Sequence, residues 1–172
     1  MSTLAEELAA LDPGAQAQLA RARAPVASTE ELIDVLLKVQ PRGWTEHHVI
    51  HALTSRGQEI FEPVARALLA DPLAPGASML GEVLVRLFAD DEIRDPRVVP
   101  TLVQAVEAVL DAGAGTQGVG GYMLLLGDCA TIAGPLPEAR ATARRVLYVA
   151  GTEVDPCPFA VAGARRLTDP PR

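Results

Sequence analysis

The three histidines of the chain lie within five residues, in the segment TEHHVIHAL at 45–53. His47 and His51 are four residues apart, and on an α-helix this spacing places both imidazoles on one face. Such a pair can coordinate one zinc ion, but a zinc site needs further ligands, and the HExxH pattern of zinc hydrolases is absent from the sequence. Three interpretations of the pair stay open: solvated side chains, contacts for a partner, and a metal site.

The helix that carries these histidines is expected over 45–56. Its apolar residues fall opposite the histidine pair, so both imidazoles should point away from the core. Thr45 is the expected N-cap, and Trp44 is expected to pack against Val49 as a hydrophobic staple. The only tryptophan of the chain would then have a structural role that needs no ligand.

A glycine-rich segment, GAGTQG from Gly113 to Gly118, fits the GxGxxG pattern of dinucleotide-binding loops. That pattern binds a pyrophosphate only where it follows a β-strand, and here it follows the helical pattern VQAVEAVLDAG. We therefore expect Gly113 to end a helix in the left-handed conformation and the glycines to form a mobile connection. The sequence implies no cofactor.

The two cysteines, Cys129 and Cys157, are expected to be free thiols, because the N-terminus lacks the pattern of a secretory signal. Cys157 lies between two prolines and is expected to be exposed. No serine or cysteine stands beside a histidine in a recognisable catalytic pattern. The sequence thus favours a protein without catalytic activity and leaves the question open.

Charged side chains supply the other candidate contacts. The net charge is −7, and the acidic residues concentrate between positions 60 and 111. The segment ADDEIRDPR at 89–97 is interpreted either as a solvated turn, in which Asp95 caps the next helix, or as a negative rim for a basic partner. Arg140 and Arg144 are four residues apart on a helix and face either solvent or an anion. The residues selected as partner contacts are His47, His51, Asp90, Asp91, Glu92, Gln104, Glu107, Arg140 and Arg144.

Composition excludes several classes of function. A net charge of −7 repels phosphate backbones, and only 3% of the residues are aromatic, so we expect no nucleic-acid partner. No uncharged apolar run reaches the length of a membrane span, so we expect no membrane contact. The expected location is the cytoplasm.

Apolar residues recur at intervals of three and four along most of the chain, which predicts an all-α fold. Pro63, Pro100 and Pro137 are each 37 residues apart, and each lies early in an expected helix. A constant period of this length is typical of helical repeats. The expected helix pairs are 45–56 with 58–70, 79–89 with 97–111, and 118–133 with 137–150, and a further helix is expected at 29–39.

The segment IRDPRVVPTLVQAVEAV at 93–109 resembles the second-helix signature of HEAT repeats, in which an Asp-Pro-Arg turn leads to a Val-Pro pair and an amphipathic helix. FEPVARALLAD is similar to it, and PLPEARATARRVL is less so because it lacks the turn. The resemblance implies a HEAT-like α-solenoid of about four helix pairs, and the alternative is an irregular helical bundle. The predicted organisation is one domain over 1–172, with capping helices at 1–27, repeats at 28–150 and a proline-rich tail at 151–172.

The tail is expected to be extended or frayed apart from one short helix at 159–167. For function, the sequence favours a protein-protein interaction module or adaptor, with an immunity-like role included, which binds a basic protein or peptide through a concave acidic surface. The first alternative is a cofactor- or metal-handling enzyme that uses the face of His47 and His51, since some proteins that resemble HEAT repeats act on bulky ligands. The second is a structural or self-associating protein, so an oligomer is possible.

Overall fold

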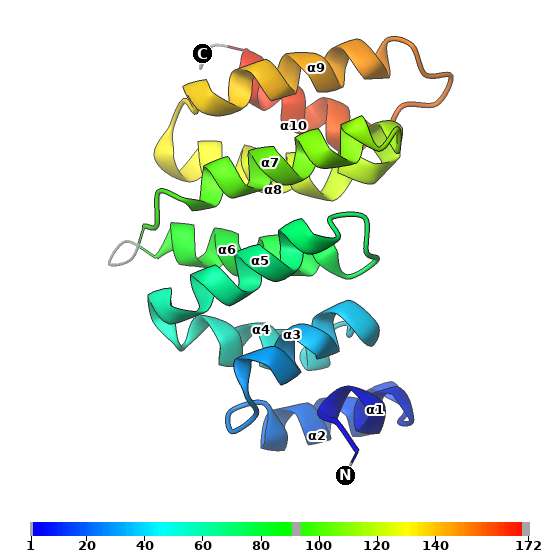
Figure 1. The fold of residues 1–172 in the computed structure, drawn as a ribbon, viewed down its shortest axis with the longest axis vertical. Coiled ribbons are helices and arrows are strands. Elements are labelled where there is room, and N and C mark those ends of the chain that lie inside the picture. The colour runs from blue at the N-terminus through cyan, green and yellow to red at the C-terminus, as the bar shows by residue number, and fades with distance from the viewer. Residues whose placement is uncertain (1, 91–93, 170–172) are drawn as a thin grey trace. The chain divides into compact units, whose positions relative to one another are not determined.

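The computed structural model describes residues 2–90 and 94–169, and the regular secondary structure of this part of the chain is entirely helical, with no β-strand (Figure 1). The predicted all-α class is confirmed. The α-helices are α1 (Leu4–Ala9), α2 (Pro13–Arg23), α3 (Thr29–Lys38), α4 (Trp44–Thr54), α5 (Phe61–Ala70), α6 (Ala77–Ala89), α7 (Val98–Asp111), α8 (Gly115–Ala133), α9 (Arg140–Ala150) and α10 (Pro158–Thr168). Two 3-10 helices, η1 (Gly57–Ile60) and η2 (Pro137–Ala139), precede α5 and α9.

The chain divides into two compact units, Met1–Leu87 and Phe88–Arg172. The first contains α1 to α5 and most of α6, and the second contains α7 to α10. Among the described residues, every helix is too short or too polar to cross a lipid bilayer.

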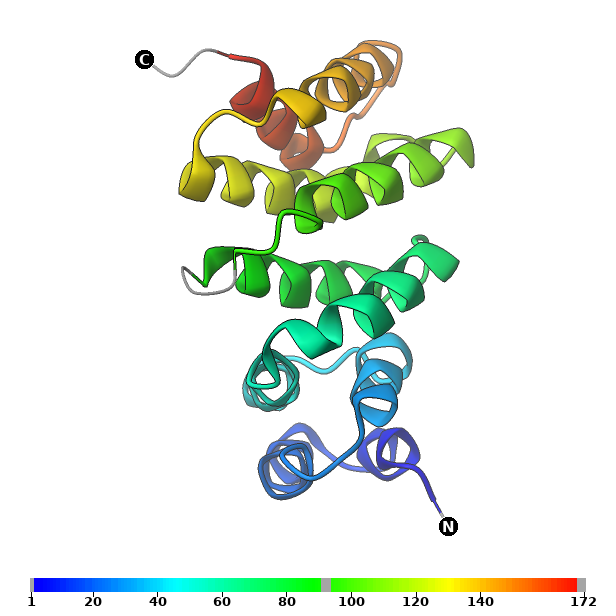
Figure 2. The same ribbon diagram turned by 60° about the vertical axis from the view of Figure 1, so that its left-hand side comes forward.

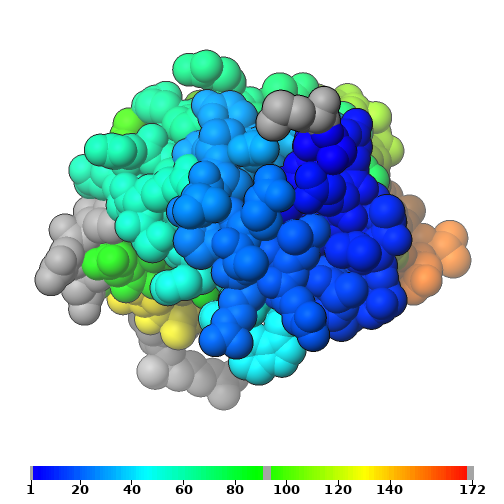
Figure 3. Space-filling model, turned by 90° about the horizontal axis from the view of Figure 1, so that it is seen from below, coloured from blue at the N-terminus to red at the C-terminus, as the bar shows by residue number. Residues whose placement is uncertain are grey.

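In the first unit, α1 packs against α2 and α3, and α4 packs against α2 and α3. In both ribbon views α3 and α4 lie side by side (Figure 1, Figure 2). Figure 3 shows that α1 and α2, in blue, make up much of the face of this unit that is seen from below. Leucines fill the interior, and Leu4, Leu8, Leu32 and Leu36 have no exposed surface.

The start of α3 forms the capping box that the sequence predicts. The Glu31 amide donates to Ser28 Oγ at 3.1 Å, and the Ser28 amide donates to Glu31 Oε2 at 2.9 Å. Each bond satisfies an amide that has no partner within the helix. Arg56, which follows α4, bonds to the Thr29 hydroxyl at 2.7 Å and so ties the end of α4 to the start of α3.

In the second unit, α8 is the central helix and packs against α7 on one side and α10 on another. Glycines allow the close approach of α8 and α10. A Cβ at Gly163 would collide with the carbonyl oxygen of Met123, and a Cβ at Gly120 would lie 2.7 Å from Cys157 Sγ. The short helix predicted at 159–167 is present as α10, and it belongs to the core of the unit through Ala160, Ala164 and Leu167.

The pairing of helices differs from the sequence prediction. We expected 118–133 to pair with 137–150, but α8 packs more extensively with α7 and α10, and α9 packs mainly with α10. The prolines still lie at helix starts, as predicted: Pro100 is the third residue of α7, and Pro137 opens η2 before α9. A proline is tolerated there because the first amides of a helix have no intrahelical acceptor.

Candidate functional site

The histidine segment folds into α4, but the helix begins one residue earlier than predicted. Its N-cap is Gly43 with φ of 63°, and Thr45 is a buried residue of the first turn, so the expected N-cap at Thr45 is wrong. Trp44 is 71% exposed and does not pack into the core as a staple. Its ring contacts imidazoles instead, which gives the only tryptophan a place in the candidate site.

The four rings of Trp44, His47, His48 and His51 form what we call the α4 ring cluster. The Trp44 ring centroid lies 5.7 Å from that of His47, edge to face, and 6.2 Å from that of His48. His47 and His51 are stacked, with ring centroids 6.1 Å apart and planes only 2° from parallel. The structure thus brings together the two histidines predicted as a pair, and places both on the exposed side of α4.

The His48 imidazole is half-buried and lies near other basic side chains. Burial lowers the pKa of His48, and the nearby positive charges of His47, Arg21 and His51 lower it further. In the described part of the chain, none of the three imidazoles forms a hydrogen bond or ion pair with another side chain or with the backbone. Their nitrogens are therefore available to a ligand.

Glu46 does not complete a metal site with these histidines. Burial raises the pKa of the Glu46 carboxyl, and the negative charge of Glu82 on α6 raises it further. Glu46 therefore lies on the side of α4 that faces α6. Within residues 2–90 and 94–169, no group of three or more His, Cys, Asp or Glu side chains is arranged to hold a metal ion. A metal ion bound at α4 would therefore have at most two ligands of these types among the described side chains.

The second set of candidate residues lies on α7 and α9. Thr142 Oγ1 donates to Glu107 Oε1 at 2.5 Å, and Arg145 bonds to the other oxygen of Glu107 and to Asp111 Oδ1, the latter at 2.5 Å. The carboxylates of Asp111 and Glu107 raise the pKa of Arg145. The Glu107 carboxylate is therefore already bonded to Thr142 and Arg145, and its side chain is half-buried. Gln104, one turn earlier, is exposed.

The acidic loop after α6 is only partly described. Asp90 is exposed, and its carbonyl oxygen accepts a hydrogen bond from the Arg94 amide at 2.8 Å, whereas Asp91 and Glu92 lie outside the described residues. Asp95 does not hold the N-cap position predicted for it, because α7 begins at Val98 with Arg97 as N-cap residue. Its carboxylate instead accepts from the amide and the guanidinium of Arg97, at 2.6–3.0 Å.

Arg140 and Arg144 are both exposed on α9. Arg140 lines a cavity of about 110 Å³ together with Arg166 and Asp169 of the α10 end and the apolar side chains of Leu136 and Leu167. Ligand pockets are usually about 300–1,000 Å³, so this cavity accommodates a small group at most.

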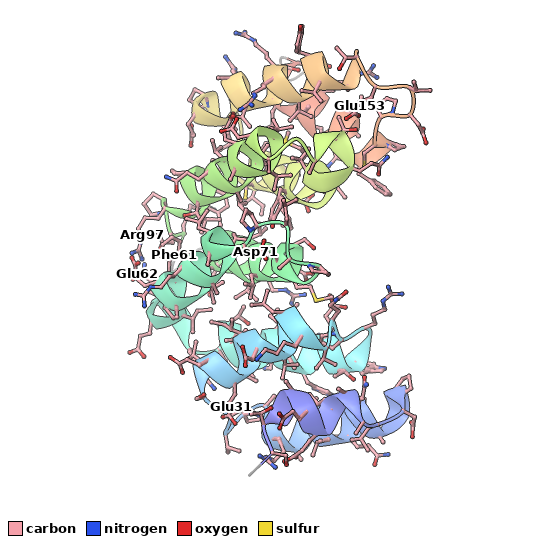
Figure 4. All side chains as sticks on the ribbon, turned by 45° about the vertical axis from the view of Figure 1, so that its right-hand side comes forward. Glu31, Phe61, Glu62, Asp71, Arg97 and Glu153 are labelled. Carbon is pink, nitrogen blue, oxygen red and sulfur yellow. The ribbon has the colours of Figure 1, made fainter. Side chains whose placement is uncertain are left out.

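The glycine-rich segment holds a contact that the sequence did not predict. Thr116, in the first turn of α8, donates its amide to Glu153 Oε1 at 2.8 Å, and its hydroxyl also donates to Glu153. Figure 4 shows Glu153 on the connection between α9 and α10. Gly113 ends α7 with φ of 76°, as predicted, but Gly115 already begins α8, so the expected mobile connection is wrong. The helix N-terminus that would receive a phosphate receives the carboxylate of Glu153.

Cys129 lies on α8, and Cys157 directly precedes α10. Both are free thiols and both are buried, so the expectation that Cys157 is exposed is wrong. The Cys157 amide donates to Thr116 Oγ1 at 2.8 Å, which anchors the connection before α10. Burial, followed by the charge of Asp128, raises the pKa of Cys129 to about 12, so this thiol stays protonated at neutral pH.

Compared with models of protein families, with curated proteins and with solved structures, the chain has no significant match.

Proposed function

We propose that this protein is a protein-protein interaction module or adaptor that binds a basic protein or peptide. The single observation that carries the proposal is the exposure of aromatic side chains. Half of the six aromatic residues lie on the surface: Trp44 is 71% exposed, Tyr148 75% and Phe159 61%. Large aromatic rings are usually mostly buried, and Trp and Tyr are enriched among residues that carry the binding energy of protein interfaces.

The charge distribution supports a basic partner. The first unit has eleven acidic and seven basic residues, and the second has eleven and eight, so both units are net negative. Several acids are paired with arginines within the protein, as Glu107 and Asp111 are with Arg145, but the overall field still attracts cations over a distance of roughly 8–10 Å at physiological salt. This field favours faster association with a positively charged protein.

The proposed architecture is a HEAT-like α-solenoid of about four helix pairs that presents a concave acidic surface. Its support is the packing of helices against one another within each unit and the position of the evenly spaced prolines at helix starts. In such a fold each pair buries its apolar side against its neighbours and leaves polar side chains free for a partner.

The test uses the full chain immobilised and exposed to extract of its native host at about 50 mM and about 500 mM salt, a range over which electrostatic attraction is strongly screened. We expect basic proteins to be retained at low salt and to be lost at high salt. The triple variant Trp44→Ala, Tyr148→Ala, Phe159→Ala should fail to retain these proteins even at low salt.

A matched control is Leu73→Ala with Val154→Ala, which also truncates exposed apolar side chains but keeps the aromatic rings. Because all five residues are exposed, neither variant should alter the melting temperature by more than a few degrees. Equal capture by the wild type and the aromatic variant, or capture of acidic proteins alone, contradicts the proposal.

A further inference from the structure

The α4 ring cluster holds two imidazoles close enough for one metal ion to reach both. With about 2.1 Å for each metal–nitrogen bond and about 1.2 Å from nitrogen to ring centre, the ring centres of two imidazoles on one ion are about 5.4 Å apart at a tetrahedral angle and at most about 6.6 Å apart. The centroids of His47 and His51 are 6.1 Å apart, and the two rings are stacked. Both rings must therefore turn about their side-chain bonds to point a nitrogen at a shared ion, but the helix itself need not move.

The two side chains are also free to turn toward a common ion. Both are exposed and stand on successive turns of α4, and an exposed side chain changes its rotamer within nanoseconds. Neither imidazole is engaged by hydrogen bonds or ion pairs from residues 2–90 and 94–169. Coordination would thus replace only water on these nitrogens.

The third imidazole of the cluster is not a member of the proposed pair. His48 is adjacent to His47 in sequence and lies about 100° away around the helix. It is therefore not on the face of α4 that carries His47 and His51.

We propose that His47 and His51 bind one divalent transition-metal ion, with water in its remaining coordination positions. Two imidazoles with water suit ions that favour nitrogen ligands, and by the general order of stability Cu²⁺ binds more tightly than Ni²⁺ or Zn²⁺. Mg²⁺ and Ca²⁺ prefer oxygen ligands and are excluded from this site. The proposal does not rest on partner binding, and either can fail without the other.

Trp44 supplies a direct probe of this site. It is the only tryptophan of the chain, and its ring centroid lies 5.7 Å from that of His47. Cu²⁺ held by His47 and His51 should quench its fluorescence. We expect titration of the untagged full chain with CuCl₂ at about pH 7.5 to give saturable quenching at one ion per chain, with no quenching by MgCl₂.

Single substitutions identify the ligands. His47→Ala and His51→Ala each remove one of two ligands, and the affinity for Cu²⁺ should fall by more than the 10–100-fold that is typical for loss of a residue that only supports a ligand. His48→Ala is the matched control and should keep at least most of the affinity. Because His47 and His51 are exposed, the variants should fold, which circular dichroism checks.

Isothermal titration with ZnCl₂ gives a second measurement that does not depend on fluorescence. Heat of binding should appear with the wild type and His48→Ala, and should disappear in the other two variants. Affinity should also fall as the solution is acidified, because protons compete with the metal ion for its ligands. Absence of saturable binding, equal binding by His51→Ala and the wild type, or loss of binding in His48→Ala overturns the assignment.

Discussion

Glu153 caps helix α8 from 37 residues further along the chain: its carboxylate accepts a hydrogen bond from the Thr116 amide at 2.8 Å. Gly115 makes this contact possible, because a Cβ at that position would collide with Glu153 Oε1. A carboxylate at a helix N-terminus is stabilised both by the free amides and by the helix dipole. The connection between α9 and α10 is thereby held on the start of α8.

We expect Glu153→Ala to lower the free energy of unfolding by about 1–2 kcal/mol, because it leaves the Thr116 amide without its acceptor. Glu153→Gln keeps an acceptor oxygen but removes the charge, so its effect should be smaller. Asp155→Asn, in the same connection, is the control and should change stability little. Urea unfolding measures all three, and an equal effect of Glu153→Ala and Asp155→Asn contradicts the capping role.

The close approach of α8 and α10 leads to a second prediction. A Cβ at Gly163 would collide with the backbone of Met123, so we expect Gly163→Ala to destabilise the protein by about 1–3 kcal/mol despite the better helix propensity of alanine.

Gly151→Ala is the matched control, because its Cβ would meet only carbonyl oxygens at 3.4 Å or more and its φ is −68°. This variant should be neutral or slightly stabilising. Thermal unfolding followed by circular dichroism distinguishes the two. If Gly163→Ala is as stable as Gly151→Ala, the helices do not pack as closely as the structure has them.

The bounds of the helices could be predicted from the sequence because local signals mark them. These signals are properties of neighbouring residues: the apolar interval of three to four, the capping box at Ser28 and the glycine at 113. The helices that they predict begin and end within a few residues of the observed ones. Which helices pack against each other depends instead on contacts between residues that are far apart in the sequence. The glycines at 120 and 163 were the available signal that α8 and α10 meet closely.

The candidate site was predictable to a similar extent. The spacing of His47 and His51 implied one exposed face, and the structure confirms that the two rings lie together. The role of Trp44 was not predictable, since a ring before a helix can turn either to the core or to the surface. The pairing of Glu107 with Arg145 spans 38 residues, close to the proline interval of 37, and that interval could have suggested it.

Both thiols are buried in the folded protein, so a reagent in solution should not reach them. We expect neither Cys129 nor Cys157 to react within minutes with a disulfide reagent at pH 8, and two thiols per chain to react in denaturant. The variants Cys129→Ser and Cys157→Ser assign any reaction that occurs. Fast modification of Cys157 in the folded chain would show that the connection before α10 opens readily.

The contact between Asp95 and Arg97 should make stability depend on pH in the acid range. Asp95 is only 1% exposed, and the hydrogen bond from the Arg97 side chain holds the pKa of its carboxyl below the ordinary value. A carboxyl whose pKa is lower in the folded state contributes stability above its unfolded pKa of about 3.9, and that contribution disappears as the pH falls through the lowered value. Asp95→Asn should therefore be less stable than the wild type at pH 7, and the difference should shrink as the pH falls below about 4.

Urea unfolding at intervals between pH 7 and pH 2.5 measures this difference, with Asp155→Asn as a control in which an exposed carboxyl is removed. The free energy of unfolding of Asp155→Asn should differ from that of the wild type by a constant amount over this pH range. That of Asp95→Asn should approach the wild-type value as the pH falls. Parallel curves for the wild type and Asp95→Asn would mean that the carboxyl is not ionised against Arg97 in the folded state, and the turn that leads into α7 would then have to be held by its backbone hydrogen bonds alone.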